Sequence, residues 1–293
     1  MSFIEQIKQR AKQEIKTIVL PEATDVRILE AAEMIKNEGY AKVILIGNEE
    51  EVRKLAKERN IDIGETKIID PAVSIETARY SKELYELRKS KGMTEEQAEK
   101  LVLEPVYFGM MMVKLNEADG LVSGAAHSTS DTLRPALQIL KTAPGTTLVS
   151  AFFVMVVPNC KYGENGTFIF ADSGLNEEPD SEKLSEIAIS SSKSFEQLVG
   201  TQPKVAMLSY STYGSAHSAS TEKVIEATKL VKEKEPNLLV DGELQLDAAI
   251  IPEVAEFKAK GSPLKGQANV LVFPDLGAGN IGYKLVQRLA KAE

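Results

Sequence analysis

The stretch from Asp119 to Ala136 holds the densest group of side chains that could do chemistry in this sequence. A short apolar strand, Gly120–Val122, leads into a loop of small residues, and a helical pattern of apolar residues follows. A run of hydroxyls and the guanidinium of Arg134 fall near the predicted start of that helix. The first N–H groups of a helix have no helical partner and carry a partial positive charge. The stretch therefore predicts a site for an oxyanion, with phosphate as the favoured ligand.

Pro135 constrains where this helix begins. A proline deep inside a helix loses a backbone hydrogen bond and clashes with the preceding turn, so we expect it in the first turn, after an N-cap at Asp131 or Thr132. An ordinary capped turn would explain the serine and glycine, but not the additional hydroxyls or the arginine. His127 lies in the loop itself and is interpreted either as a group that exchanges a proton or as a packed, hydrogen-bonded residue.

Two further strand-to-helix connections are rich in small polar residues. One of them, Ser209–Ser218, follows the predicted strand Lys204–Leu208 and carries more hydroxyls than a turn requires. The other, Val272–Lys284, contains Gly279, which permits close backbone approach, and Asn280, which can act as a cap or a ligand donor. Taken alone, this second connection is an ordinary glycine-rich loop. Because ligands of open α/β sheets bind at the carboxyl ends of strands, three such ends together predict one cleft between two domains.

Apolar strand-like runs alternate with helical patterns along almost the whole chain, which is typical of α/β architecture with a largely parallel sheet. The exception is an antiparallel hairpin, predicted from Leu148–Val157 and Thr167–Ala171 around a turn rich in glycine and asparagine. A turn signal at Ala143–Thr147 predicts a boundary between one domain of residues 1–145 and another of residues 146–293.

Composition narrows the classes of partner. The net charge of −8 argues against nucleic acid and anionic membranes, both of which favour basic surfaces. One cysteine and two histidines leave no ligand pattern for a transition metal, so we expect no metal site. The N-terminus has no signal-peptide pattern and no apolar run is long enough to span a bilayer, so we expect a cytoplasmic protein.

The local patterns around two arginines, the cysteine and a pair of carboxylates predict no catalytic role for them. Arg88 falls near the end of a predicted helix and Arg27 on the surface of another, where both are expected to be solvated. Cys160 precedes a turn with only Lys161 beside it, so an inert thiol is favoured over a nucleophile. The paired carboxylates of Asp241–Asp247 are interpreted as structural or as lining the cleft.

Taken together, five segments give the chain a recognisable family resemblance. They are SGAAHSTSDTLRPA (123–136), FADSG (170–174), VAMLSYST (205–212), DGELQLDAA (241–249) and FPDLGAGNIGYK (273–284). In this order, over essentially the whole chain, they resemble the phosphate acetyltransferase (phosphotransacetylase) family. The resemblance implies reversible acetyl transfer between coenzyme A and phosphate without a metal. It also implies a homodimer of two α/β/α domains with a cleft between them, similar to the isocitrate and isopropylmalate dehydrogenases. Phosphate butyryltransferases share this fold, so the acyl group stays open.

The resemblance also assigns site residues. Arg134 and Arg88 correspond to arginines that bind the substrate anion and act in catalysis, and Arg27 corresponds to one linked with coenzyme A. The predicted substrate-binding residues are Ser128, Thr129, Ser130, His127, Asn280 and Tyr283. The predicted residues for coenzyme A are Arg27, Gly279 and Lys284. We expect the coenzyme A thiolate to attack acetyl phosphate in a ternary complex, with a ping-pong route through acetyl-Cys160 as the rival.

Two departures from the family pattern bear on activity. Tyr213 and His217 stand where many relatives have lysines, which removes two positive charges near the predicted cleft. Family members also continue past the position of Glu293 with a Ser-Arg-Gly motif and an aspartate thought to deprotonate the thiol. On this ground the 293-residue chain is expected to be a truncated form or a damaged enzyme, and a truncated, inactive form that only binds phosphate or acyl phosphate is the alternative to an active acetyltransferase.

Overall fold

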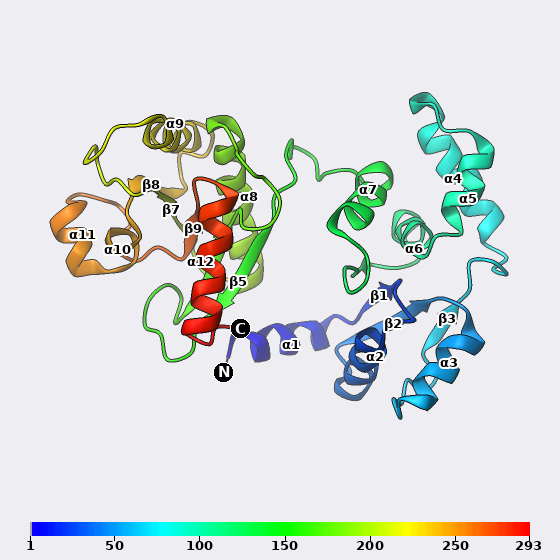
Figure 1. Cartoon of the computed structure of the whole chain (residues 1–293). Helices are drawn as coiled ribbons and strands as arrows, with labels where there is room; N and C mark the ends of the chain where they lie inside the picture. Colours follow the sequence, from blue (N-terminus) through cyan, green and yellow to red (C-terminus); the bar gives the residue numbers. More distant parts are fainter. Residues whose placement is uncertain (1) are drawn as a thin grey trace. The chain divides into compact units, whose positions relative to one another are not determined.

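The chain folds into two compact units, residues 1–141 and 142–293, each built around its own β-sheet. The computed structural model shown in Figure 1 describes residues 2–293. Both units are α/β with mainly parallel strands, as the alternating pattern predicts.

The sheet of the first unit has four parallel strands in the order β3-β2-β1-β4. They are β1 (Lys16–Leu20), β2 (Ala41–Ile46), β3 (Lys67–Ile69) and β4 (Gly120–Leu121). Val19 of β1 pairs with Leu121 of β4, so the carboxyl ends of these two strands are neighbours. The chain segments that follow them are therefore placed side by side.

Helices cover both faces of this sheet (Figure 1). Because side chains alternate along a strand, Val19 and Ile44 pack against the helices within residues 77–139, whereas Leu20 and Leu45 pack against the helices within residues 26–58. The helices are α1 (Phe3–Gln13), α2 (Val26–Glu38), α3 (Glu49–Glu58), α4 (Thr77–Arg88), the 3-10 turn Lys89–Lys91, α5 (Glu95–Val102), α6 (Pro105–Lys114) and α7 (Thr129–Ile139).

The sheet of the second unit has five strands in the order β5-β6-β9-β7-β8. They are β5 (Phe152–Val156), β6 (Thr167–Ala171), β7 (Lys204–Leu208), β8 (Leu239–Leu244) and β9 (Val270–Val272). β5 pairs antiparallel with β6, which confirms the predicted hairpin, and the other pairs are parallel.

Two helix layers enclose the second sheet. α8 (Ser181–Val199) and α9 (Ala219–Lys234) bury one face. α10 (Leu246–Ile250), α11 (Pro252–Lys258) and α12 (Leu276–Leu289) contribute to the core on the other face. The short helices α10 and α11 were not predicted, since each is too short to show a helical period in the sequence.

The start of α7 differs from its prediction. The N-cap is Ser128, whose hydroxyl accepts a hydrogen bond from the backbone N–H of Asp131 at 3.3 Å, rather than Asp131 or Thr132. Pro135 consequently lies inside the helix instead of in its first turn. The expectation for Pro135 was wrong because a good serine cap three residues earlier outweighs the single backbone hydrogen bond that proline removes.

The helix α12 also begins earlier in the sequence than predicted. Asp275 is its N-cap and accepts from the backbone N–H of Ala278 at 2.8 Å. Gly277, Gly279 and Asn280 therefore belong to the first turns of the helix, and the predicted glycine-rich loop up to Lys284 is wrong. An aspartate cap starts the helix before the glycines, whose backbone flexibility had suggested a loop.

Candidate active site

A buried carboxylate holds the loop of residues 122–128 that follows β4. Glu22 lies two residues after β1, and its side chain is 1% exposed. Its two carboxylate oxygens accept the backbone N–H groups of four consecutive residues, Gly124–His127, at 2.7–2.9 Å. Oε2 takes the first two N–H groups and Oε1 takes the other two, so both oxygens are fully used by the loop.

The environment of Glu22 keeps it ionised. Burial raises the pKa of this carboxyl, but the hydrogen bonds from the loop N–H groups and from the ring of His127 outweigh burial and lower the pKa to about 2. The protein's own carboxylate thus occupies the ring of N–H groups that would otherwise suit an anionic ligand. A phosphate at this edge of the sheet must use other donors.

His127 is also bound by Glu22. Its Nδ1 lies 2.8 Å from Glu22 Oε1, and its ring is about one-third exposed. Because an ionised carboxylate can only accept, Nδ1 must carry the proton and donate it. His127 is therefore hydrogen-bonded, as one of the two interpretations expected, while its other nitrogen stays available.

The hydroxyls at the start of α7 are partly used by the helix itself. Ser128 Oγ donates to Asp131 Oδ2 at 2.6 Å and lies 2.9 Å from Ser130 Oγ. This hydrogen bond from Ser128 is the main reason that the pKa of Asp131 is lowered. Thr129 is the first residue of the helix and is exposed. The predicted phosphate cradle thus holds three hydroxyls together with one carboxylate.

Arg88 is the last residue of α4 and Arg134 lies on α7, and these two helices contact each other. Burial raises the pKa of Tyr107, and the positive charges of Arg134 on α7 and Arg88 at the end of α4 act against that rise. The Tyr107 hydroxyl donates to Gln138 Oε1 at 2.9 Å, which links α6 to α7. The packing of α4 against α7 places two arginines that are 46 residues apart in the sequence on neighbouring helices.

Neither guanidinium has an ion pair within residues 2–293, and the Nε of Arg88 is buried without a hydrogen-bond partner. The Nε–H group of Arg88 is therefore free to donate a hydrogen bond to an anion. Two cations without an ion pair on contacting helices favour an anion with several oxygens. Arg88 is half-buried while Lys89 and Ser90 after it are exposed, so the solvated position predicted from its local pattern is confirmed only in part: its Nε is buried.

Arg27 contacts the same loop from α2. Its guanidinium donates to both carboxylate oxygens of Asp25, the N-cap of α2, and to the carbonyl oxygen of Ala125. Its side chain remains 67% exposed. Arg27 is therefore on the surface, as its pattern predicted, and it also joins α2 to the loop that Glu22 holds.

In the second unit, Gly279 has a packing role. A Cβ atom at this position would lie 2.6 Å from the carbonyl oxygen of Asp172 and 2.7 Å from the hydroxyl of Ser173. Only glycine allows α12 to approach this segment. The carboxylate of Asp172 in turn accepts N–H groups of Gly174 and Leu175, both at 2.9 Å, and so fixes the turn after β6.

Three other predicted residues lie along α12. Asn280 Oδ1 accepts from Lys284 Nζ at 2.7 Å, and the ring of Tyr283 stacks on Phe153 with ring centres 4.2 Å apart. The start of the helix, including Asn280, lines a surface hollow of about 660 Å³ that also holds Lys223. Of these three residues, Asn280 alone lines that hollow.

The paired carboxylates of β8 are structural. Asp241 accepts the hydroxyl of Tyr213 at 2.5 Å, and Glu243 accepts the backbone N–H of Gly214 at 2.7 Å. Burial, followed by the hydrogen bond to Asp241, raises the pKa of Tyr213 to about 12. These contacts fix the hydroxyl-rich loop 209–218, which is one of the two interpretations given for the Asp241–Asp247 segment.

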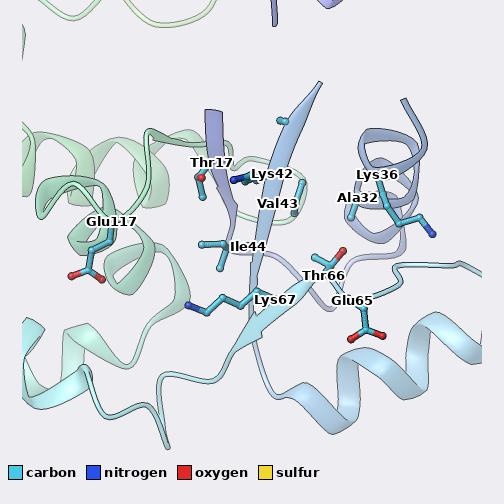
Figure 2. A pocket seen from close by; sticks show the side chains of 11 residues that line it. Thr17, Ala32, Lys36, Lys42, Val43, Ile44, Glu65, Thr66, Lys67 and Glu117 are labelled. Atoms are coloured by element: carbon cyan, nitrogen blue, oxygen red, sulfur yellow. The ribbon is translucent and has the colours of Figure 1, made fainter. Parts of the chain in front are cut away.

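The hollow shown in Figure 2 lies at the edge of the first sheet where the strands begin, opposite the edge that carries the candidate site. It measures about 560 Å³ and is lined by residues near the starts of the strands, including Thr17, Lys42 and Lys67. None of the predicted site residues lines it. The hydrogen-bond pattern at the carboxyl edge, and not the size of a cavity, therefore locates the candidate site.

The sequence did not single out Glu22 or Tyr107. The only signal for Glu22 is its position directly after the first strand, at the edge where ligands of α/β sheets bind.

Within residues 2–293, no cluster of three or more His, Cys, Asp or Glu side chains is arranged to hold a metal ion. The helices of that range include none with the length and apolar character needed to cross a membrane.

Comparison with known proteins decides the family. Residues 2–293 match the family model described as "Phosphate acetyl/butaryl transferase". The chain belongs to this family. The phosphate acetyltransferase of Acetivibrio thermocellus is 66% identical over 293 residues, which cover 100% of this chain and 88% of that protein. The phosphate acetyltransferase of Thermoanaerobacterium thermosaccharolyticum is 54% identical over 292 residues, covering 100% of this chain and 88% of that protein.

A solved structure has the same fold. The EutD phosphotransacetylase from Staphylococcus aureus superposes with a TM-score of 0.90 at 46% sequence identity, covering 99% of this chain and 87% of that chain. The family resemblance of the five segments is thereby confirmed, together with an α/β fold that has parallel sheets.

Proposed function

We propose that this chain is a phosphate acetyltransferase, which transfers acetyl reversibly between coenzyme A and phosphate: acetyl-CoA and phosphate give coenzyme A and acetyl phosphate. The family membership and the 66% identity to a phosphate acetyltransferase support this reaction. The structural observation that supports the proposal is the pair of guanidinium groups without an ion pair, Arg88 and Arg134, on the contacting helices α4 and α7. An acyl phosphate offers the several anionic oxygens that such a pair requires.

In the proposed reaction the thiolate of coenzyme A attacks the carbonyl carbon of acetyl phosphate within a ternary complex. Arg134 is the main partner for the charge that develops, and Arg88 is the second clamp on the phosphate. Thr129 and Ser130 at the start of α7 supply neutral donors for the remaining phosphate oxygens, and Ser128, whose hydroxyl donates to Asp131, caps the helix beside them.

Coenzyme A carries phosphates that need cations. We assign Arg27 and Lys284 to these phosphates, together with the helix start around Gly279, and we assign Asn280 and Tyr283 to the substrate. The support is the exposed guanidinium of Arg27 and the hollow that Asn280 lines at the start of α12.

The finer architecture is proposed from the family resemblance. Residues 1–145 and 146–293 would form two α/β/α domains similar to those of isocitrate and isopropylmalate dehydrogenases, with the substrates in a cleft between them. The protein would be a cytoplasmic homodimer that uses coenzyme A as a substrate and needs no metal.

The ping-pong rival requires Cys160 to be a nucleophile. Cys160 is half-buried and packs in the apolar cluster around Met155 and Phe168. No described residue forms a hydrogen bond or ion pair with its thiol, so nothing is placed to activate it. Cys160→Ala is therefore expected to keep turnover within about threefold of the wild type, whereas an acetyl-Cys160 intermediate predicts its loss.

The test is an initial-rate assay of the purified protein with coenzyme A and acetyl phosphate, following the thioester and free phosphate. Equal yields of both products and intersecting double-reciprocal lines are expected. Parallel lines would exclude the ternary complex. Comparing the rates with acetyl phosphate and butyryl phosphate decides which acyl group is preferred. Calorimetric binding of acetyl phosphate without thioester formation would establish the alternative of a protein that only binds.

A further inference from the structure

His127 is held through one ring nitrogen only. Its Nδ1 donates to Glu22 Oε1 at 2.8 Å, and its backbone N–H donates to the same oxygen at 2.7 Å. Glu22 is 1% exposed, whereas the ring of His127 is 32% exposed. No residue within 2–293 forms a hydrogen bond to Nε2. The ring is thus fixed on its protein side and open on the other, as in a carboxylate–histidine pair that moves protons.

The ring lies at the start of α7. His127 directly precedes the N-cap Ser128, whose hydroxyl donates to Asp131 Oδ2 at 2.6 Å. The charged groups around His127 are therefore Glu22 after β1, Asp131 and Arg134 on α7, and Arg27 of α2, which binds the neighbouring carbonyl of Ala125. His127 thus directly precedes Ser128 and, beyond it, Thr129 and Ser130, whose hydroxyls we assign to phosphate.

The reaction needs a proton at that end. When the C–O bond of acetyl phosphate breaks, the bridging oxygen leaves with an electron pair, and phosphate without a proton on it would be a trianion. A donor at this oxygen lets the product leave as hydrogen phosphate. A positioned general acid contributes typically about 10²–10⁴-fold to such a step.

We propose that His127, protonated on both ring nitrogens, is a catalytic residue whose Nε2–H protonates the leaving phosphate oxygen, and that Glu22 is a positioning residue that fixes the ring through Nδ1. This inference rests on the proposed function and adds to it a proton donor. The sulfur–carbon bond forms, the carbon–oxygen bond to phosphate breaks, and the proton moves from Nε2 to the released oxygen. The proton given up by the thiol recharges the imidazole through solvent, so that one proton passes overall from thiol to phosphate. In the reverse direction Nε2 accepts the proton of the attacking phosphate.

A pair of substitutions separates a catalytic from a structural histidine. In His127→Asn the amide nitrogen takes the place of Nδ1 and can still donate to Glu22, but nothing replaces Nε2. We expect kcat to fall by about 10²-fold or more, with the KM for coenzyme A within about twofold and the melting temperature unchanged. His127→Gln, whose nitrogen lies nearer the place of Nε2, is expected to lose both kcat and the contact with Glu22. Near-normal kcat in His127→Asn would overturn the proposal, since the ring would then serve only to hold the loop.

A spectroscopic measurement tests the positioning without turnover. The sequence has two histidines, so ¹⁵N spectra of the wild type, with His217→Gln for assignment, can resolve the ring of His127. We expect its neutral form to be the Nδ1–H tautomer, and we expect Glu22→Gln to shift the population towards Nε2–H. An Nε2–H tautomer in the wild type would overturn the role of Glu22. Absence of thioester formation by the wild type would instead refute the proposed function, and the two failures are thereby distinguished.

Discussion

Replacing Glu22 by glutamine tests how much the buried carboxylate contributes to the fold. In the wild type, two oxygens each accept two loop N–H groups of Gly124–His127. Glutamine keeps one oxygen and turns an NH₂ group towards the other pair of donors, so two hydrogen bonds to a charged acceptor are lost. At about 1.5 kcal/mol for each such bond, the loss is about 3 kcal/mol.

The lowered pKa of Glu22 expresses the effect of the same hydrogen bonds as a dependence of stability on pH. Folding lowers this pKa from 4.5 to about 2, and each unit corresponds to about 1.4 kcal/mol, so ionised Glu22 contributes about 3 kcal/mol at pH 7. Because the folded pKa is the lower one, this stabilisation is present above pH 4.5 and is lost as the pH falls towards 2. At pH 3 it has fallen to roughly 1 kcal/mol.

The assay is urea unfolding of the wild type and Glu22→Gln at pH 7, 4 and 3. We expect the variant to lose about 3 kcal/mol at pH 7 and to approach the wild type as the pH falls. Glu30→Gln is the matched control, because Glu30 is exposed on α2 and its removal changes the net charge equally. A deficit below about 0.5 kcal/mol at pH 7, or one that does not shrink in acid, would refute the reasoning.

Three further substitutions test the remaining contacts. Arg88→Ala removes a buried, unpartnered Nε, so we expect unchanged or higher stability with about tenfold or more weaker binding of inorganic phosphate by calorimetry; unchanged binding would remove Arg88 from the anion site. Gly109→Ala places a Cβ 2.6 Å from Leu121 and 2.9 Å from Val19, so we expect a loss of about 1–3 kcal/mol in urea unfolding, and wild-type stability would show that the sheet yields there. Arg27→Ala should raise the KM for coenzyme A several-fold and leave that for acetyl phosphate nearly unchanged, and a parallel change in both constants would contradict its assignment.

The sequence was most informative about strands with clear limits. The apolar runs Thr167–Ala171 and Lys204–Leu208 form β6 and β7 over those same residues, because each is bounded by turn residues and buried along most of its length. Helix starts were harder to place. Ser128 and Asp275 are caps whose strength depends on hydrogen bonds that local residue preferences alone do not rank.

The site was predicted in part, because only those of its residues that are close together in the sequence could be recognised as a group. The hydroxyls, His127 and Arg134 are neighbours in sequence, so their grouping was visible there. The clamp by Glu22 joins residues more than 100 positions apart, and the placement of Arg88 and Arg134 on neighbouring helices depends on the packing of α4 against α7. Neither contact leaves a local pattern in the sequence.

The central claim is acetyl transfer between coenzyme A and phosphate at the site that contains Arg134. The most direct measurement is the turnover of the wild type and of Arg134→Ala, side by side, with acetyl phosphate and coenzyme A. We predict thioester and phosphate in equal amounts from the wild type, and a kcat for Arg134→Ala that is lower by about 10²–10³-fold with its fold intact. A wild type that forms no thioester, or an Arg134→Ala variant that turns over at the wild-type rate, would contradict the account.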